Sequence, residues 1–251
     1  MGINQNLVLK SSNMPPHQID MVDPSNAVLL QALEDYATAA YRLGYFNPIF
    51  SKKSLAQLNV ISVEKKQEIA SFLRLCIEWF SQCEFEQMKE NETPFLLVAL
   101  ERYGLEVDEE LLATIDHDTV IEVYSENMVQ LFRSFGLLKL TGYSIMDLSV
   151  FEWYMLWERP SLVIEQMQAD IGFVMRNEIP FKRFDVVRHI LKETFDTGLT
   201  EPFVPRAGFV DFQYIGCLKR KTPTAPRAFI CTGKGSVIAE GLAEAEHLAF
   251  L

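Results

Sequence analysis

The chain has 251 residues, of which 49% are hydrophobic and 23% charged, and its formal net charge is −11 at pH 7. This composition excludes wholesale disorder, and the acidic charge argues against nucleic-acid binding, which relies on clustered lysine and arginine. No stretch approaches the roughly 18 apolar residues that cross a bilayer, and residues 1–14 lack the pattern of a signal peptide, so we expect a cytoplasmic protein without membrane contact.

The first part of the chain predicts an arm followed by a helical domain. Residues 1–22 are mixed in character and predict an extended arm. Asp23-Pro24 then gives a helix start, with the aspartate as N-cap and the proline in the first turn, and Gly44 stops this helix. We place the helical domain, an N-terminal bundle, at residues 23–117.

Further helices follow within this domain. An apolar stripe at helical spacing predicts the clearest one, and its members are Ile69, Phe72, Leu73, Cys76, Trp79 and Phe80. Thr93-Pro94 begins another helix, which ends at Gly104. Asp108 is the predicted N-cap of a further short helix. Glu109 and Glu110 would lie in its first turn, where the helix dipole favours negative charge.

The character of the sequence changes near residue 118. Two short apolar runs, 120–124 and 128–132, are separated by three polar residues, which is typical of a β-hairpin. Helical periodicity returns at 135–141 and stops at Gly142. Ser144 and Asp147 then form an S-x-x-D capping pattern, which predicts a further short helix.

The rest of the chain predicts two helices and then strands. Pro160 opens one helix, and the spacing of apolar residues predicts a second over 184–195. Strands are expected at 209–218, 228–231 and 236–239, with turns at 222–226 and 232–235 between them. The fold class is therefore α+β, with a helical bundle before a five-stranded antiparallel sheet and flanking helices.

These residues resemble a PAS domain. Residues 120–160 are similar to its first half: two strands, the string Leu140-Thr141-Gly142-Tyr143-Ser144, and a segment that ends in Arg159-Pro160. Residues 209–239 resemble the three-strand meander that completes the sheet. Arg133-Ser134 stand where an asparagine or similar polar residue is usual. The resemblance implies a PAS-like sensory domain over residues 118–251.

An aromatic segment suggests where a ligand would lie. Residues 151–157 contain two tryptophans, a tyrosine and a phenylalanine, which favour either a buried core helix or the wall of a ligand pocket. If a pocket exists in the PAS-like domain, the residues expected to line it are Tyr143, Trp153, Trp157, Phe212, Tyr214 and Phe229.

Other candidate groups have plain structural interpretations. His189 falls in the helix predicted before the third strand, where haem-binding PAS domains place their iron ligand, but its position points to the side of that helix. Cys217 and Cys231 would face each other across a hairpin centred near residue 224 and are simplest as buried apolar residues. Glu122, near two aspartates, predicts part of a solvated acidic connector.

Three functions remain open. The first is a sensory or regulatory protein whose PAS-like domain binds a small ligand or a partner and signals through protein contact, as a homodimer or with another protein. The second is an adaptor that binds proteins and holds no ligand, which a core without a cavity of roughly 300 Å³ would favour. The third is a thiol-dependent enzyme in which Cys217 or Cys231 pairs with His189. Without a recognisable catalytic motif, we expect no enzyme activity.

Overall fold

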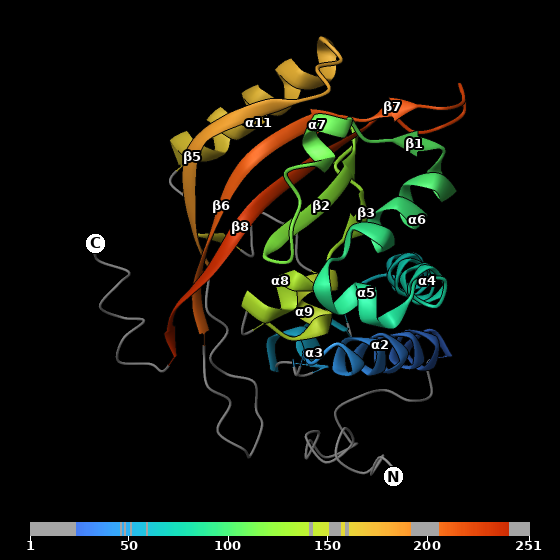
Figure 1. The fold of residues 1–251 in the computed structure, drawn as a ribbon. Coiled ribbons are helices and arrows are strands. Elements are labelled where there is room, and N and C mark those ends of the chain that lie inside the picture. The colour runs from blue at the N-terminus through green and yellow to red at the C-terminus, as the bar shows by residue number, and fades with distance from the viewer. Residues whose placement is uncertain are drawn as a thin grey trace.

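The protein combines a helical region with an antiparallel sheet (Figure 1). The helical region comes first in the chain and packs beside one edge of the sheet. The computed structural model describes residues 24–45, 47, 49–50, 52–58, 60–140, 143–150, 157–158, 161–191 and 206–240. The predicted arm at residues 1–22 lies outside this described part.

Amphipathic helices build the N-terminal region. They are α2 (Pro24–Arg42), α3 (Lys52–Leu58), α4 (Val63–Phe80), α5 (Phe85–Glu90) and α6 (Thr93–Tyr103). Helix α2 packs along α4. The stripe predicted on α4 is the face it buries, with only Phe72 partly accessible, so the hydrophobic spacing placed this helix correctly.

Polar side chains cap the starts of two helices, and a glycine follows the end of a third. The Ser62 hydroxyl caps α4 by accepting the Lys65 backbone N–H at 3.2 Å. Gly104 follows α6 with φ of 66°, a left-handed conformation that glycine adopts without strain. The Asp108 carboxylate accepts the Glu110 N–H at 2.9 Å, which confirms the predicted cap of a short helix.

The second part of the chain is strand-rich. Its elements are β1 (Leu105–Glu106), α7 (Glu109–Leu112), β2 (Thr119–Ser125), β3 (Gln130–Arg133), α8 (Gly136–Leu140), α9 (Ile145–Val150), β4 (Trp157–Glu158), α11 (Ser161–Arg176), β5 (Lys182–Leu191), β6 (Arg206–Cys217), β7 (Lys219–Arg220) and β8 (Ala228–Glu240). The main sheet has the order β3-β2-β8-β6-β5-β4, and β1 pairs with β7 in a small separate ladder.

The main sheet joins a hairpin to a meander. Strands β2 and β3 form the predicted hairpin, and β5, β6 and β8 are successive antiparallel neighbours. Strand β8 also pairs with β2, with Ile121 opposite Thr232, so the two parts make one sheet. The predicted α+β architecture, a helical region before a five-stranded antiparallel sheet, is confirmed, and the two-residue β4 adds a short strand at the β5 edge.

One predicted helix is wrong. Residues 184–191, expected to be helical, belong to strand β5, and residues 192–195 lie outside the described part. Val187 pairs with Phe212, and His189 pairs with Val210. The segment is rich in β-branched side chains, whose stiff χ1 angles favour a strand, and pairing with β6 decides in favour of the strand over the helical spacing.

The last predicted turn is also wrong. Residues 232–235 lie within the continuous strand β8, because β2 and β6 flank this stretch and pair with it on both sides. The register also separates the two cysteines that were expected to face each other. Cys217 lies opposite Phe229, and Cys231 lies opposite Ile215. All four cysteines of the chain are free thiols.

Helices and sheet share one hydrophobic core. The ring of Phe135, just before α8, stacks on Tyr36 of α2 at 4.9 Å and on Phe95 of α6 at 5.3 Å between centroids. Phe95 also meets Phe132 of β3 edge-on at 4.8 Å. The predicted boundary at residue 118 falls in the loop before β2, and these aromatic contacts hold the two sides together.

Candidate functional site

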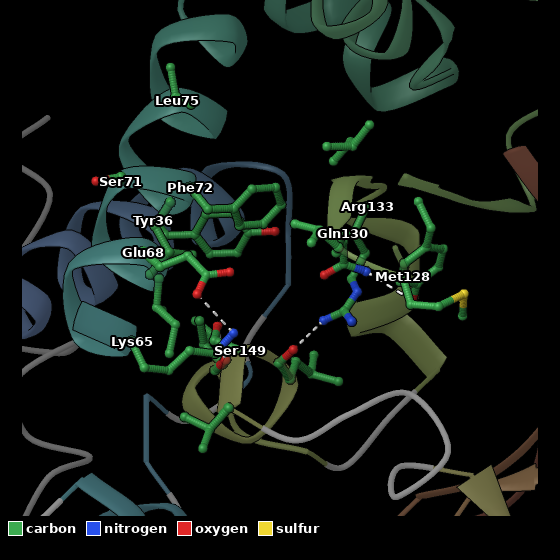
Figure 2. Close-up of a pocket in the computed structure, with 18 of the residues that line it drawn as sticks. Tyr36, Lys65, Glu68, Ser71, Phe72, Leu75, Met128, Gln130, Arg133 and Ser149 are labelled. Carbon is green, nitrogen blue, oxygen red and sulfur yellow. Dashed lines mark hydrogen bonds and ion pairs between the residues drawn. The ribbon is translucent and has the colours of Figure 1, made fainter. Parts of the chain in front are cut away.

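A cavity of about 430 Å³ opens between α4 and the β2–β3 hairpin, with α9 below it (Figure 2). Tyr36 and Phe72 lie on its helical side, and Gln130 and Arg133 face them from the hairpin side. The cavity therefore sits where the helical region meets the sheet, and it is lined by segments that lie more than 100 residues apart in the chain, from Tyr36 to Val150.

Most of the lining is apolar. Helix α4 contributes Phe72 with its neighbours, the hairpin contributes Met128 with its neighbours, and α8 and α9 close the remaining side. The apolar lining residues are Ile69, Phe72, Leu73, Leu75, Met128, Val129, Leu131, Leu138, Ile145, Leu148 and Val150. Such a lining accepts an apolar molecule and leaves orientation to a few polar groups.

The principal polar group at the floor is Arg133, the last residue of β3. Its side chain is 10% exposed, and Nη1 donates to the carbonyl oxygen of Leu148 in α9 at 2.5 Å. Its Nε lies 3.4 Å from the Glu122 carboxylate but forms no hydrogen bond within the described residues. Glu122, predicted to be a solvated connector residue, is instead buried as the counter-charge of this arginine.

A hydrogen-bond network holds the Glu122 carboxylate in place. The Tyr124 hydroxyl donates to it at 3.0 Å, and the Gln130 amide donates to it at 3.4 Å. The same Gln130 amide donates to the Tyr124 oxygen at 3.1 Å. Burial raises the pKa of Tyr124, and the neighbouring Glu122 charge raises it further, so this hydroxyl keeps its proton. The hairpin thus presents a paired and rigid polar floor.

Tyr36 is a polar group on the helical side, where Ser71 and Tyr103 also line the cavity. Its ring is held by the stack on Phe135, and its side chain points into the cavity toward the hairpin (Figure 2). The hydroxyl forms no hydrogen bond with any residue in the described part of the chain. Burial raises the pKa of Tyr36, so the hydroxyl remains a donor.

The mouth of the cavity carries a pair of opposite charges. Lys65 and Glu68, one turn apart on α4, form an exposed ion pair of 3.1 Å. The rim therefore adds no net charge, and a pair this exposed contributes little to stability.

The predicted pocket residues lie elsewhere. Tyr143 is buried beside α9, where its carbonyl accepts the Asn47 side chain at 3.0 Å. Phe212 is buried on β6, Tyr214 packs against Phe181 with tilted rings, and Phe229 stacks against Tyr124 at 5.8 Å. These four do not line the cavity between α4 and the hairpin.

The two tryptophans and the candidate haem ligand are only partly placed. Trp153 lies outside the described residues, and Trp157 is placed only by its backbone, which pairs with Leu191. His189 lies in strand β5 and not in the expected helix. Haem ligation by His189 and a pocket around the tryptophans stay predictions.

The structure separates the groups of the thiol-enzyme hypothesis. His189 lies opposite Val210 on β6, seven residues from Cys217 and five from Ile215, which faces Cys231. At about 3.3 Å a residue these separations are roughly 15 Å or more. Burial raises the pKa of the Cys217 thiol, which disfavours the reactive thiolate.

The sequence singled out several residues that line the cavity, but it did not predict that they lie together. Three members of the α4 stripe, Ile69, Phe72 and Leu73, line it, although the stripe predicted only a buried face. Arg133 stood out as a departure from the PAS pattern, and that departure was the available signal for a charged floor. Nothing in the sequence pointed to Tyr36.

In comparison with known proteins, no family model matches the chain, and no curated protein matches it in sequence. Among the described residues, no group of three or more His, Cys, Asp or Glu side chains is arranged to hold a metal ion. Within the same residues, no helix has both the length and the apolar character to span a membrane.

Proposed function

We propose that the protein is a regulatory sensor that binds a small, largely apolar molecule in the cavity between α4 and the β2–β3 hairpin and signals its occupancy through protein contact. The observation that carries the proposal is the cavity itself, about 430 Å³ with an apolar wall and a polar floor. Small-molecule sites typically have volumes of roughly 300–1,000 Å³ and this kind of lining.

The position of the cavity supports a signalling role. Its walls come from the helical region on one side, with Phe72, and from the sheet on the other, with Arg133. A ligand between them contacts both regions, so its binding free energy favours the arrangement in which the walls are closed around it. Ligand binding therefore increases the population of one conformation of the helical surface, and a partner that contacts this surface can distinguish the bound from the free state.

The arrangement of the sheet is in keeping with a PAS-like domain. A hairpin, β2–β3, is followed by helices and then by the meander β5–β6–β8, whose last strand returns to pair with β2. The resemblance implies a hairpin, helices and a meander in this order, although it placed the meander at residues 209–239 and the structure begins it with β5 at Lys182. The cavity also weighs against the alternative of an adaptor without a ligand, for which a core lacking such a space was expected.

Binding of a neutral apolar fluorophore, N-phenyl-1-naphthylamine, to the full chain tests the proposal. Its emission increases when it leaves water for an apolar site, so we expect saturable enhancement with the wild-type protein. Leu75 lines the cavity and is 38% exposed, so Leu75→Trp fills part of the space without disturbing the Arg133–Glu122 pair. This variant should weaken binding by about tenfold or more, which is about 1.4 kcal/mol.

Arg74→Trp is the matched control, because Arg74 is the exposed neighbour on α4 and does not line the cavity. Its affinity should stay within about twofold of the wild-type value. Absence of saturable binding to the wild type, or equal binding to the wild type and Leu75→Trp, would overturn the proposal.

A further inference from the structure

Polar side chains of both kinds line the cavity, and two of its donors, the Tyr36 hydroxyl and the Arg133 Nε–H, have no acceptor among the described residues. The Tyr36 hydroxyl points into the space, keeps its proton because burial raises its pKa, and has no acceptor among the described residues. On the facing wall Arg133 has one N–H, at Nε, without a hydrogen bond. The Arg133 Nε–H is a buried donor without an acceptor, and the Tyr36 hydroxyl opens on the cavity, so a ligand that supplies an acceptor gains more than its apolar contacts alone provide.

The charges around these donors cancel. The Glu122 carboxylate lies 3.4 Å from the Arg133 Nε and is itself buried, so the floor carries no net charge. The Lys65–Glu68 pair at the mouth is neutral as well. An anionic ligand would have to leave water for a site with no uncompensated positive charge, and it would approach Glu122 while doing so.

Resting on the proposed function, we infer that the ligand is an electrically neutral, apolar molecule with one hydrogen-bond acceptor, such as a ketone, ester or amide carbonyl, which the Tyr36 hydroxyl binds. Carboxylates and phosphates of the same size are discriminated against by the closed Arg133–Glu122 pair. Tyr36 thus orients the ligand, and the Arg133–Glu122 pair selects for a neutral one.

Three naphthalenes of similar size separate these contributions. They are 2-acetylnaphthalene, a neutral ketone; 2-ethylnaphthalene, which lacks an acceptor; and 2-naphthoate, which is anionic. Each competes with N-phenyl-1-naphthylamine for the full chain. The ketone should bind about fivefold more tightly than the ethyl compound, as one net hydrogen bond allows, and more tightly than the naphthoate.

Tyr36→Phe removes the donor and keeps the ring that stacks on Phe135. In this variant the ketone should lose its advantage over the ethyl compound, while binding of the ethyl compound should change by less than about twofold. Circular dichroism of the variant checks that the fold is kept.

Equal binding of ketone and ethyl compound to the wild type, or an advantage that survives Tyr36→Phe, overturns the role of Tyr36. Tightest binding of 2-naphthoate overturns the assignment of a neutral ligand. If none of the three displaces the fluorophore from a site that Leu75→Trp blocks, this inference is wrong and the proposed function stands. If the fluorophore itself does not bind, the proposed function is overturned instead.

Discussion

The Glu92 carboxylate accepts the backbone N–H of Phe135 over 2.6 Å and so joins the start of α6 to the start of α8. The Tyr45 hydroxyl lies 3.5 Å from the other carboxylate oxygen. Phe135 is also the residue whose ring packs between α2 and α6. One acidic side chain thus ties the helical region to the segment that follows β3, close behind the cavity floor.

This position makes stability depend on pH. Burial raises the pKa of Glu92 to about 7, although the N–H groups of Phe135 and Gly136 oppose the rise. The pKa of Glu92 is higher in the folded than in the unfolded state, so protonated Glu92 favours folding. This contribution to stability is complete below the unfolded-state pKa and is lost as the pH rises through about 7. Glu92→Gln keeps an acceptor but does not titrate. The difference in unfolding free energy, variant minus wild type, should therefore increase by at most about 2 kcal/mol from pH 5.5 to pH 8.

Urea unfolding of both proteins across this pH range measures the difference. Glu90→Gln serves as the control, because Glu90 is an exposed carboxylate two residues away at the end of α5. Its difference from the wild type should stay within about 0.5 kcal/mol at every pH. A Glu92→Gln profile parallel to the wild-type profile would show that Glu92 ionises normally in the folded protein.

The Arg133–Glu122 pair should behave as a coupled unit. Glu122→Gln leaves the arginine charge buried without its counter-ion, and Arg133→Met leaves the carboxylate in the same position. Each single change should cost about 3 kcal/mol or more of unfolding free energy. The double variant should cost at least about 1 kcal/mol less than the sum, because it buries neither charge alone.

A double-mutant cycle from urea unfolding at pH 7.5 measures this coupling. Additivity within about 0.5 kcal/mol would mean that the two side chains, 3.4 Å apart, do not compensate each other in solution.

The capping pair of α9 gives a more local prediction. The Ser144 hydroxyl accepts the Asp147 N–H at 3.0 Å, and the Asp147 carboxylate accepts the Ser144 N–H at 3.0 Å. Ser144→Ala should therefore cost about 1–2 kcal/mol of unfolding free energy. Ser149→Ala removes only a hydroxyl bonded back to the Ile145 carbonyl of the same helix, and it should cost less than about 0.5 kcal/mol. Equal losses in thermal or urea unfolding would contradict the cap.

Features set by near neighbours in the chain were predictable from the sequence. The Ser144–Asp147 cap and the glycine end of α6 at Gly104 depend on residues within one turn of each other, and both are present as predicted. The apolar spacing of α4 was as clear, because one helix face has to be buried whatever it packs against.

Features set by distant partners were not predictable. The apolar residues of 184–191 fit one face of a helix, and pairing with β6, which begins at Arg206, makes this stretch a strand. The cavity is a stronger case, because it exists where side chains from α2, α4 and the hairpin fail to meet. No spacing within one segment encodes such a gap. Glu122 likewise looked solvated until β3 placed Arg133 beside it.

The segment just before β5, at Ile179 and Pro180, lies in close contact with the end of β6. The N–H of Cys217 donates to the Ile179 carbonyl at 2.8 Å, so the segment before β5 lies directly on β6. A Cβ atom at Gly216 would lie 2.1 Å from the carbonyl oxygen of Pro180, a contact that the backbone cannot relieve without moving. Gly216→Ala should cost about 2 kcal/mol or more of unfolding free energy.

Gly172→Ala is the matched control on α11, where the nearest atom to the added carbon is Nη1 of the flexible Arg176 side chain at 3.1 Å. Alanine is a better helix former than glycine, so this change should stabilise the protein by up to about 1 kcal/mol. The two substitutions add the same methyl group and should shift the urea midpoint in opposite directions. A Gly216→Ala variant at least as stable as the wild type would mean that the approach of Pro180 to β6 is looser in solution than in the structure.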